Sequence, residues 1–303
     1  MLRIFQSRPY WKRSLLVALA AMAWLGGGDP ARVRAGAPYH SIPSAPTVQP
    51  DPSAGEVLGS SAAARLLALL GPAESVAAQL ALPDLQTVPP TGFRVSYLTN
   101  GRRVLLFNNM AWNSGRGPLE LGGEVNLAAG QIEVRQHLTI AAETGVDLLV
   151  GHFLWHPYHN HWHLDTFALY ELWTLTPHGE LDTLITSSSK LSYCMIDTDI
   201  VDRDLAGSSP SRAFRGCGRL RQGLSPGWGD EYRSHLEGQY VNIAGLPDGI
   251  YALLSTANPS GSLFESNYTN NAAISYVRLV GDRVYSVPSL HMDSVLCRAQ
   301  GKC

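Results

Sequence analysis

Five of the ten histidines in this chain lie within twelve residues, and this cluster is the segment best suited to chemistry. The cluster ends in an alternating run, His159-Asn160-His161-Trp162-His163. Because side chains alternate between two faces of an extended chain, His159, His161 and His163 are expected to face one point. Neutral imidazole is a common ligand for copper and zinc, so the spacing predicts a metal site in preference to a solvated polar segment.

The composition limits the classes of partner that the chain is expected to bind. The chain has 303 residues, of which 16% are charged, with a formal net charge of −2. This length allows a substantial core, and the low charge content is not typical of a disordered chain. Beyond the first 34 residues there is no basic run, so we expect no nucleic-acid partner.

The first 37 residues have the pattern of an export signal. Basic residues precede an apolar run over 14–25, and Ala35-Gly36-Ala37 offers a cleavage sequence. The run is too short for a comfortable membrane span, although an uncleaved anchor is the alternative. The sequence therefore predicts a secreted or periplasmic protein whose mature chain has no transmembrane span.

The rest of the chain divides into a leader and one large domain. Residues 38–81 are rich in Pro, Ser, Gly and Ala and include a short amphipathic helical pattern, which indicates a linker or leader. Residues 82–303 are expected to form a mainly β, antiparallel, sandwich-like domain with long loops and little helix. Expected strands lie at 103–107, 167–175, 240–243, 250–256 and 273–280, whereas 194–239 reads as a functional loop.

The chain has four cysteines, Cys194, Cys217, Cys297 and Cys303. Their even number in a chain with a predicted export signal favours disulfides. Three pairings are possible from the sequence. Loop closure favours the near neighbours, which are Cys194 with Cys217 and Cys297 with Cys303.

Further landmarks follow the histidines in a fixed order. They are Lys190-Leu191-Ser192-Tyr193-Cys194 with Asp197-Thr198, Gly223-Leu224-Ser225-Pro226-Gly227 leading to Tyr232, Gly249-Ile250-Tyr251, Asn258-Pro259, and Glu265-Ser266-Asn267-Tyr268-Thr269-Asn270-Asn271. Together with the histidine run, they resemble the catalytic domain of the lysyl oxidases, which are copper-dependent protein-lysine amine oxidases. The resemblance extends over about two thirds of the chain, from Leu82 to Tyr285.

The resemblance implies a role for several residues. His159, His161 and His163 would bind copper, in agreement with their spacing. Lys190 and Tyr232 match the pair from which the family makes its own cofactor, lysine tyrosylquinone. The family's cysteine pairing also corresponds to Cys194 with Cys217. The tail motif resembles the family's calcium site, which here would be formed by Asp84, the Leu85 carbonyl, Glu265, Asn267, Asn270 and Asn271, with Asn267 where the family usually has Asp.

The implied reaction converts a primary amine, either peptidyl lysine or a small amine, to an aldehyde with O2, releasing H2O2 and ammonia. A quinone is needed because no unmodified side chain supplies such an electron sink. Leu169 replaces a family histidine that could handle protons, which leaves Asp165, His156 and Glu171 as candidate bases. Two other departures from the animal enzymes are a longer spacing between Lys190 and Tyr232, and Tyr158 at the position of a cysteine.

Two other functions are compatible with the histidines. A non-enzymatic copper-binding protein on the same fold would need neither Lys190 nor Tyr232. A zinc hydrolase would combine three histidines with a well-placed acidic base, but the chain has no H-E-x-x-H pattern. The amine oxidase is favoured over both because Lys190 and Tyr232 fall within matching motifs.

Overall fold

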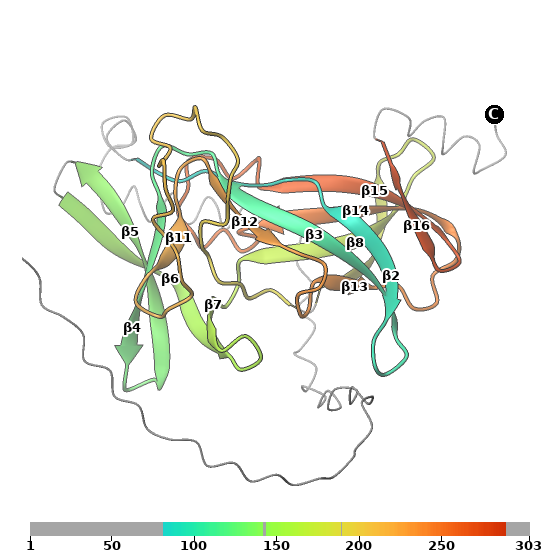
Figure 1. Ribbon diagram of the computed structural model, residues 1–303, viewed down its shortest axis with the longest axis horizontal. Helices are drawn as coiled ribbons and strands as arrows, with labels where there is room; N and C mark the ends of the chain where they lie inside the picture. The colour runs from blue at the N-terminus through green and yellow to red at the C-terminus, as the bar shows by residue number, and fades with distance from the viewer. Residues whose placement is uncertain (1–80, 142–143, 189, 289–303) are drawn as a thin grey trace, which may run out of the picture. The chain divides into compact units, whose positions relative to one another are not determined.

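The computed structural model describes residues 81–141, 144–188 and 190–288, and these residues form β-strands joined by turns and loops (Figure 1). The predicted export signal, nearly all of the predicted leader, and Cys297 and Cys303 lie outside the described residues. Within the described residues there is no helix, and hence none long and apolar enough to cross a membrane. The expected mainly β, antiparallel class is confirmed.

The strands belong to three antiparallel sheets. Their bounds are β1 Leu85–Thr87, β2 Thr91–Tyr97, β3 Arg103–Asn113, β4 Leu119–Asn126, β5 Gln131–Ala141, β6 Thr144–His156, β7 His161–Leu164, β8 Ala168–Leu175, β9 Leu181–Ser187, β10 Asp199–Ile200, β11 Gln222–Leu224, β12 Trp228–Tyr232, β13 Tyr240–Asn242, β14 Gly249–Ala257, β15 Ala272–Val280 and β16 Arg283–Val287. All five strands expected from the sequence are present; four differ by small amounts at their ends, and β3 extends to Asn113, well beyond its expected end at 107.

The first sheet is built around β3, which pairs with β1, β2, β12 and β13, and β12 in turn pairs with β10. A second sheet has the order β16-β15-β14-β8-β9. These two sheets pack together, as expected for a sandwich-like domain. The ring of Phe107 meets that of Tyr170 edge-on at 4.8 Å, and Thr87 Oγ1 lies 2.9 Å from Ser255 Oγ. From Leu105 to Asn113, alternate residues of β3 are buried, as expected for a strand that packs one face against a second sheet.

The third sheet, of order β11-β4-β5-β6-β7, carries the histidine run on its last strand. Two buried glutamine side chains connect it to the rest of the domain. Gln136 donates to the Phe264 carbonyl and accepts from the Phe264 N–H, each at 2.7 Å. Gln222 donates to the Trp162 carbonyl and accepts from the Met195 N–H. The bonds of Gln222 hold the histidine strand against the segment that carries the lysine motif.

Candidate metal and cofactor site

The histidines lie on a hairpin formed by β6 and β7, in which His156 pairs with His161. The turn closes through the His159 and Asn160 N–H groups, which both donate to the His156 carbonyl. Asn160 has φ 55°, a left-handed conformation that asparagine tolerates better than most residues. The prediction of an extended run is therefore right for His161 and His163 and wrong for His159, which lies in the turn.

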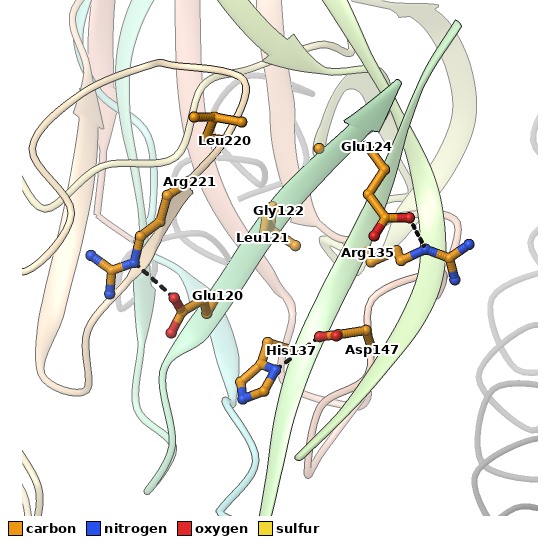
Figure 2. Close-up of a pocket in the computed structure, with 10 residues that line it drawn as sticks. Glu120, Leu121, Gly122, Glu124, Arg135, His137, Asp147, Leu220 and Arg221 are labelled. Carbon is orange, nitrogen blue, oxygen red and sulfur yellow. Dashed lines mark hydrogen bonds and ion pairs between the residues drawn. The ribbon is translucent and has the colours of Figure 1, made fainter. Parts of the chain in front are cut away.

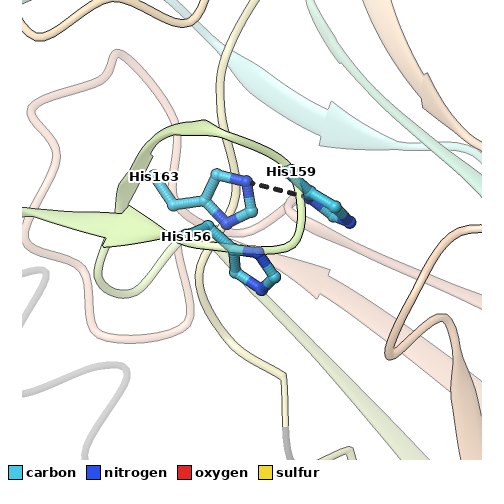
Figure 3. Close-up of side chains that lie close together, drawn as sticks. All are labelled: His156, His159 and His163. Carbon is cyan, nitrogen blue, oxygen red and sulfur yellow. Dashed lines mark hydrogen bonds between the residues drawn. The ribbon is translucent and has the colours of Figure 1, made fainter. Parts of the chain in front are cut away.

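The turn does not separate the histidines, because their ring nitrogens converge on His163. Its Nε2 lies 2.8 Å from Nε2 of His161 and 3.4 Å from Nδ1 of His159. His156 joins them, with its ring stacked on His159 at 4.2 Å and on His163 at 4.6 Å between centroids. Ligand atoms of His156, His159 and His163 all lie within 4.8 Å of one another (Figure 3).

The cluster has the donor chemistry and the spacing that a transition metal requires. Two nitrogens bound to one metal at about 2.0–2.1 Å are separated by roughly 3 Å, close to the distances around His163. Burial, with the nearby Lys190 charge next in importance, lowers the pKa of His159 to about 4 and that of His163 to about 2. The rings are consequently neutral at physiological pH, which is the form that binds metals.

The lysine motif runs antiparallel to the histidine strand. The N–H groups of Leu164 and Tyr193 each donate to the other residue's carbonyl, and Ser192 Oγ lies 3.4 Å from His163 Nδ1. Lys190 is partly buried, and its Nζ lies 5.1 Å from the centre of the Tyr193 ring. Burial lowers the pKa of Lys190 to about 8, which increases the fraction of neutral, nucleophilic amine.

Tyr232 ends β12 and contacts the same tyrosine as Lys190. Its ring meets that of Tyr193 edge-on at 4.6 Å, and its hydroxyl donates to the Cys194 carbonyl. Burial raises the pKa of Tyr232 well above its usual value. Asp230, two residues earlier on β12, is buried and accepts from the Ile196 N–H at 3.2 Å. Lys190 and Tyr232 thus both contact Tyr193, a residue that sequence reasoning did not single out.

The long segment between the two motifs is held by a disulfide and by one carboxylate. Cys194 and Cys217 are bonded, with Cα atoms 5.5 Å apart, the pairing favoured by loop closure and by the family resemblance. The buried carboxylate of Asp197 accepts from the N–H groups of Ala213, Phe214 and Ser225, and from the Ser225 hydroxyl. These bonds order a segment that lacks sequence periodicity.

The structure adds Glu237 to the site. Its carboxylate Oε2 lies 3.3 Å from His156 Nε2 and 3.9 Å from His159 Nε2, and its backbone carbonyl accepts from Lys190 Nζ at 2.8 Å. Glu237 lies five residues after Tyr232 in a loop. No periodic pattern or motif pointed to it.

The candidate bases lie in different surroundings. His156 belongs to the histidine cluster. Asp165 Oδ2 lies 3.4 Å from His152 Nδ1. Glu171 is buried on β8, where burial raises its pKa. Leu169, also on β8, pairs with Thr256 of β14.

Most of the predicted calcium ligands come together at one end of β1. The buried carboxylate of Glu265 accepts from the Leu85 N–H and from the Asn271 amide, and the Asn270 amide donates to Asp84. The side-chain oxygens of Asn270 and Asn271 are buried without a hydrogen-bond partner. Leu85 therefore faces Glu265 through its N–H, and Asn267 Oδ1 instead accepts from the N–H and hydroxyl of Thr269.

A separate pocket of about 310 Å³ lies on β4, β5 and β6 (Figure 2). It is lined by paired charges, which are Glu120 with Arg221, Glu124 with Arg135, and His137 with Asp147. None of the predicted metal or cofactor residues lines it. It therefore has no part in the site described above.

In a comparison with known proteins, residues 146–288 match the family model for lysyl oxidase. Over 134 residues, 44% of this chain, it is 30% identical to human lysyl oxidase homolog 3, covering 16% of that protein. It is 31% identical to chicken protein-lysine 6-oxidase over 135 residues, and 32% identical to the human protein-lysine 6-oxidase over 133 residues, covering 29% of each. The chain thus matches less than a third of the length of these relatives.

Proposed function

We propose that this chain, whose residues 146–288 match the lysyl oxidase family model, is an exported amine oxidase that depends on copper and on a quinone formed from its own side chains. It would convert primary amines, either peptidyl lysine or small amines, to aldehydes with release of H2O2 and ammonia. The observation that carries this proposal is that Lys190 and Tyr232 both contact Tyr193, which pairs with the strand that bears the converging histidines.

His159, His161 and His163 are the proposed copper ligands. Their support is the convergence of neutral nitrogens on His163. An all-nitrogen site binds copper(II) more strongly than zinc where both are supplied. Once bound, copper would supply the redox chemistry that O2-dependent oxidation of a tyrosine ring needs.

Lys190 and Tyr232 are the proposed precursors of lysine tyrosylquinone. Burial favours the neutral amine of Lys190, and the Tyr193 ring is a shared neighbour of both side chains. In the structure each side chain is held by a backbone carbonyl, Lys190 by that of Glu237 and Tyr232 by that of Cys194.

A structural calcium ion is proposed at Asp84, Leu85, Glu265, Asn267, Asn270 and Asn271. Its support is the gathering of hard oxygen donors and the two buried asparagine oxygens that lack partners. For the Leu85 carbonyl and for Asn267 the support is the family resemblance alone. Residues 82–303 are the proposed catalytic domain, which follows an export signal at 1–37 and a leader at 38–81.

A redox-cycling stain for quinones, applied to the copper-loaded and aerated chain, tests the proposal. The wild-type chain should stain and should release H2O2 when a primary amine is added. Tyr232→Phe should bind copper but give neither signal, because phenylalanine has no phenol to oxidise. A wild-type chain that holds one equivalent of copper but never stains would instead be a non-enzymatic copper-binding protein.

A further inference from the structure

The loop over residues 233–239 brings a carboxylate to the histidine hairpin. Glu237 side-chain atoms remain 27% exposed, yet its Oε2 is fully covered and has no hydrogen-bond partner within the described residues. This oxygen lies 3.3 Å from His156 Nε2 and 3.9 Å from His159 Nε2. A covered carboxylate oxygen whose polar neighbours are imidazole nitrogens is costly unless a proton or a metal cation lies close to it.

The backbone of the same residue holds the proposed cofactor lysine. Lys190 Nζ donates to the Glu237 carbonyl at 2.8 Å. The next residue, Gly238, has φ +76°, and a Cβ added there would lie 2.7 Å from Cδ and 3.0 Å from Cβ of Lys190. A glycine is therefore required at this position for two reasons, its left-handed backbone and the close approach of the lysine side chain.

We propose that Glu237 adds a carboxylate oxygen to the metal site formed by the histidines, while its backbone carbonyl holds the Lys190 amine next to that site. This inference rests on the proposed function for copper binding by the histidines and for the identity of Lys190 as a cofactor precursor. The role of the carboxylate follows from its two contacts with the imidazole nitrogens and from its lack of another partner. Oxygen ligands from carboxylates commonly complete histidine sites.

The arrangement ties metal binding to the position of the lysine. The carboxylate and the backbone carbonyl of Glu237 are a few bonds apart. A carboxylate drawn to the metal therefore also fixes the position of the carbonyl that accepts from Lys190. The same loop begins directly after Tyr232, the other proposed precursor. The two precursors and the metal site are thereby connected through one short segment.

Glu237→Gln tests the carboxylate, because glutamine keeps the size of the side chain and removes its charge. The purified full chain is loaded with copper(II), its spectrum is recorded by electron paramagnetic resonance, and its affinity is measured by competition with a chelator. Replacement of the negatively charged oxygen ligand by a neutral amide should change the spectrum and weaken copper binding about 10–100-fold. Glu180→Gln, at an exposed carboxylate between β8 and β9, is the matched control and should change neither.

Glu237→Asp and Gly238→Ala separate the two contacts. Aspartate keeps the charge but is one methylene shorter, so it should bind copper with an affinity between those of the wild type and Glu237→Gln. Gly238→Ala should lower the yield of the peptide that joins Lys190 to Tyr232, because the added methyl group would displace the Lys190 side chain. Thermal unfolding of each metal-free variant identifies any that are misfolded, and Glu237→Asp then provides the decisive comparison.

Identical spectra and affinities for the wild type and Glu237→Gln would overturn the carboxylate's role. An unchanged yield of cross-linked peptide in Gly238→Ala would overturn the role of the Glu237 backbone carbonyl in holding Lys190. If the wild type forms no cross-link, the proposed function fails, but the copper measurements still decide whether Glu237 contributes to the metal site.

Discussion

Removal of the Cys194–Cys217 disulfide should destabilise the domain and loosen the histidine hairpin. The bond connects residues 23 apart in sequence and closes the loop between the lysine and tyrosine motifs. The Cys217 carbonyl also accepts from the Trp162 N–H at 3.0 Å, which attaches this loop directly to the strand of His161 and His163. The perturbation is the double variant Cys194→Ala/Cys217→Ala, which leaves no single unpaired thiol at this site.

The magnitude follows from the length of the closed loop. For a loop of this size, the loss of entropy in the unfolded chain corresponds to about 3 kcal/mol of stabilisation. For a domain of about 200 residues, this free energy corresponds to a decrease in Tm of roughly 6–12 °C. The bonds of Asp197 to Phe214 and Ser225 remain, so the segments next to the two cysteines should stay in contact.

The assay is denaturant unfolding of the metal-free chain, with the wild type under reducing conditions as the control. The double variant should have a lower unfolding midpoint, and reduction of the wild type should reproduce most of this change. A decrease in the free energy of unfolding below about 1 kcal/mol would show that Cys194–Cys217 does not constrain this loop in the way described.

Three further outcomes are expected. His161→Ala should abolish stoichiometric copper, and a full copper equivalent by elemental analysis would refute its assignment as a ligand. Burial raises the pKa of Glu265 and of Asp230 to about 7, so both groups hold protons more tightly in the folded chain. The free energy of unfolding of the metal-free chain should therefore fall as pH rises from about 4 to 7. In Glu265→Gln this pH-dependent fall should be smaller by on the order of 3 kcal/mol. An unchanged pH profile in this variant would contradict the expectation. Asn160→Val should lower the stability by roughly 1–2 kcal/mol, whereas Asn160→Gly should be tolerated, as measured by thermal unfolding, because the position is left-handed.

The strands were predictable from the sequence because their side chains alternate or form apolar runs. Strands β14 and β15 lie within one or two residues of the expected ranges, and β3 extends further than its expected core at 103–107. The division into three sheets was not predictable. It depends on long-range contacts, such as that between Gln136 and Phe264, which leave no local pattern in the sequence.

The site was predictable where residue type and spacing carry the chemistry. The gathering of His159, His161 and His163 was expected, but the turn that brings His159 to the cluster depends on the backbone of Asn160. The approach of Glu237 depends on a glycine-containing loop whose conformation no periodic pattern encodes. Loop residues of this kind become visible only when the fold is known.

The most direct test of the central claim is peptide mapping of the full chain after exposure to copper and O2. We expect one cross-linked peptide that joins residue 190 to residue 232, accompanied by new visible absorbance. Lys190→Ala and Tyr232→Phe should each lose it while keeping copper. A copper-loaded, aerated wild-type chain that releases H2O2 from primary amines with Lys190 and Tyr232 both unmodified would contradict the account.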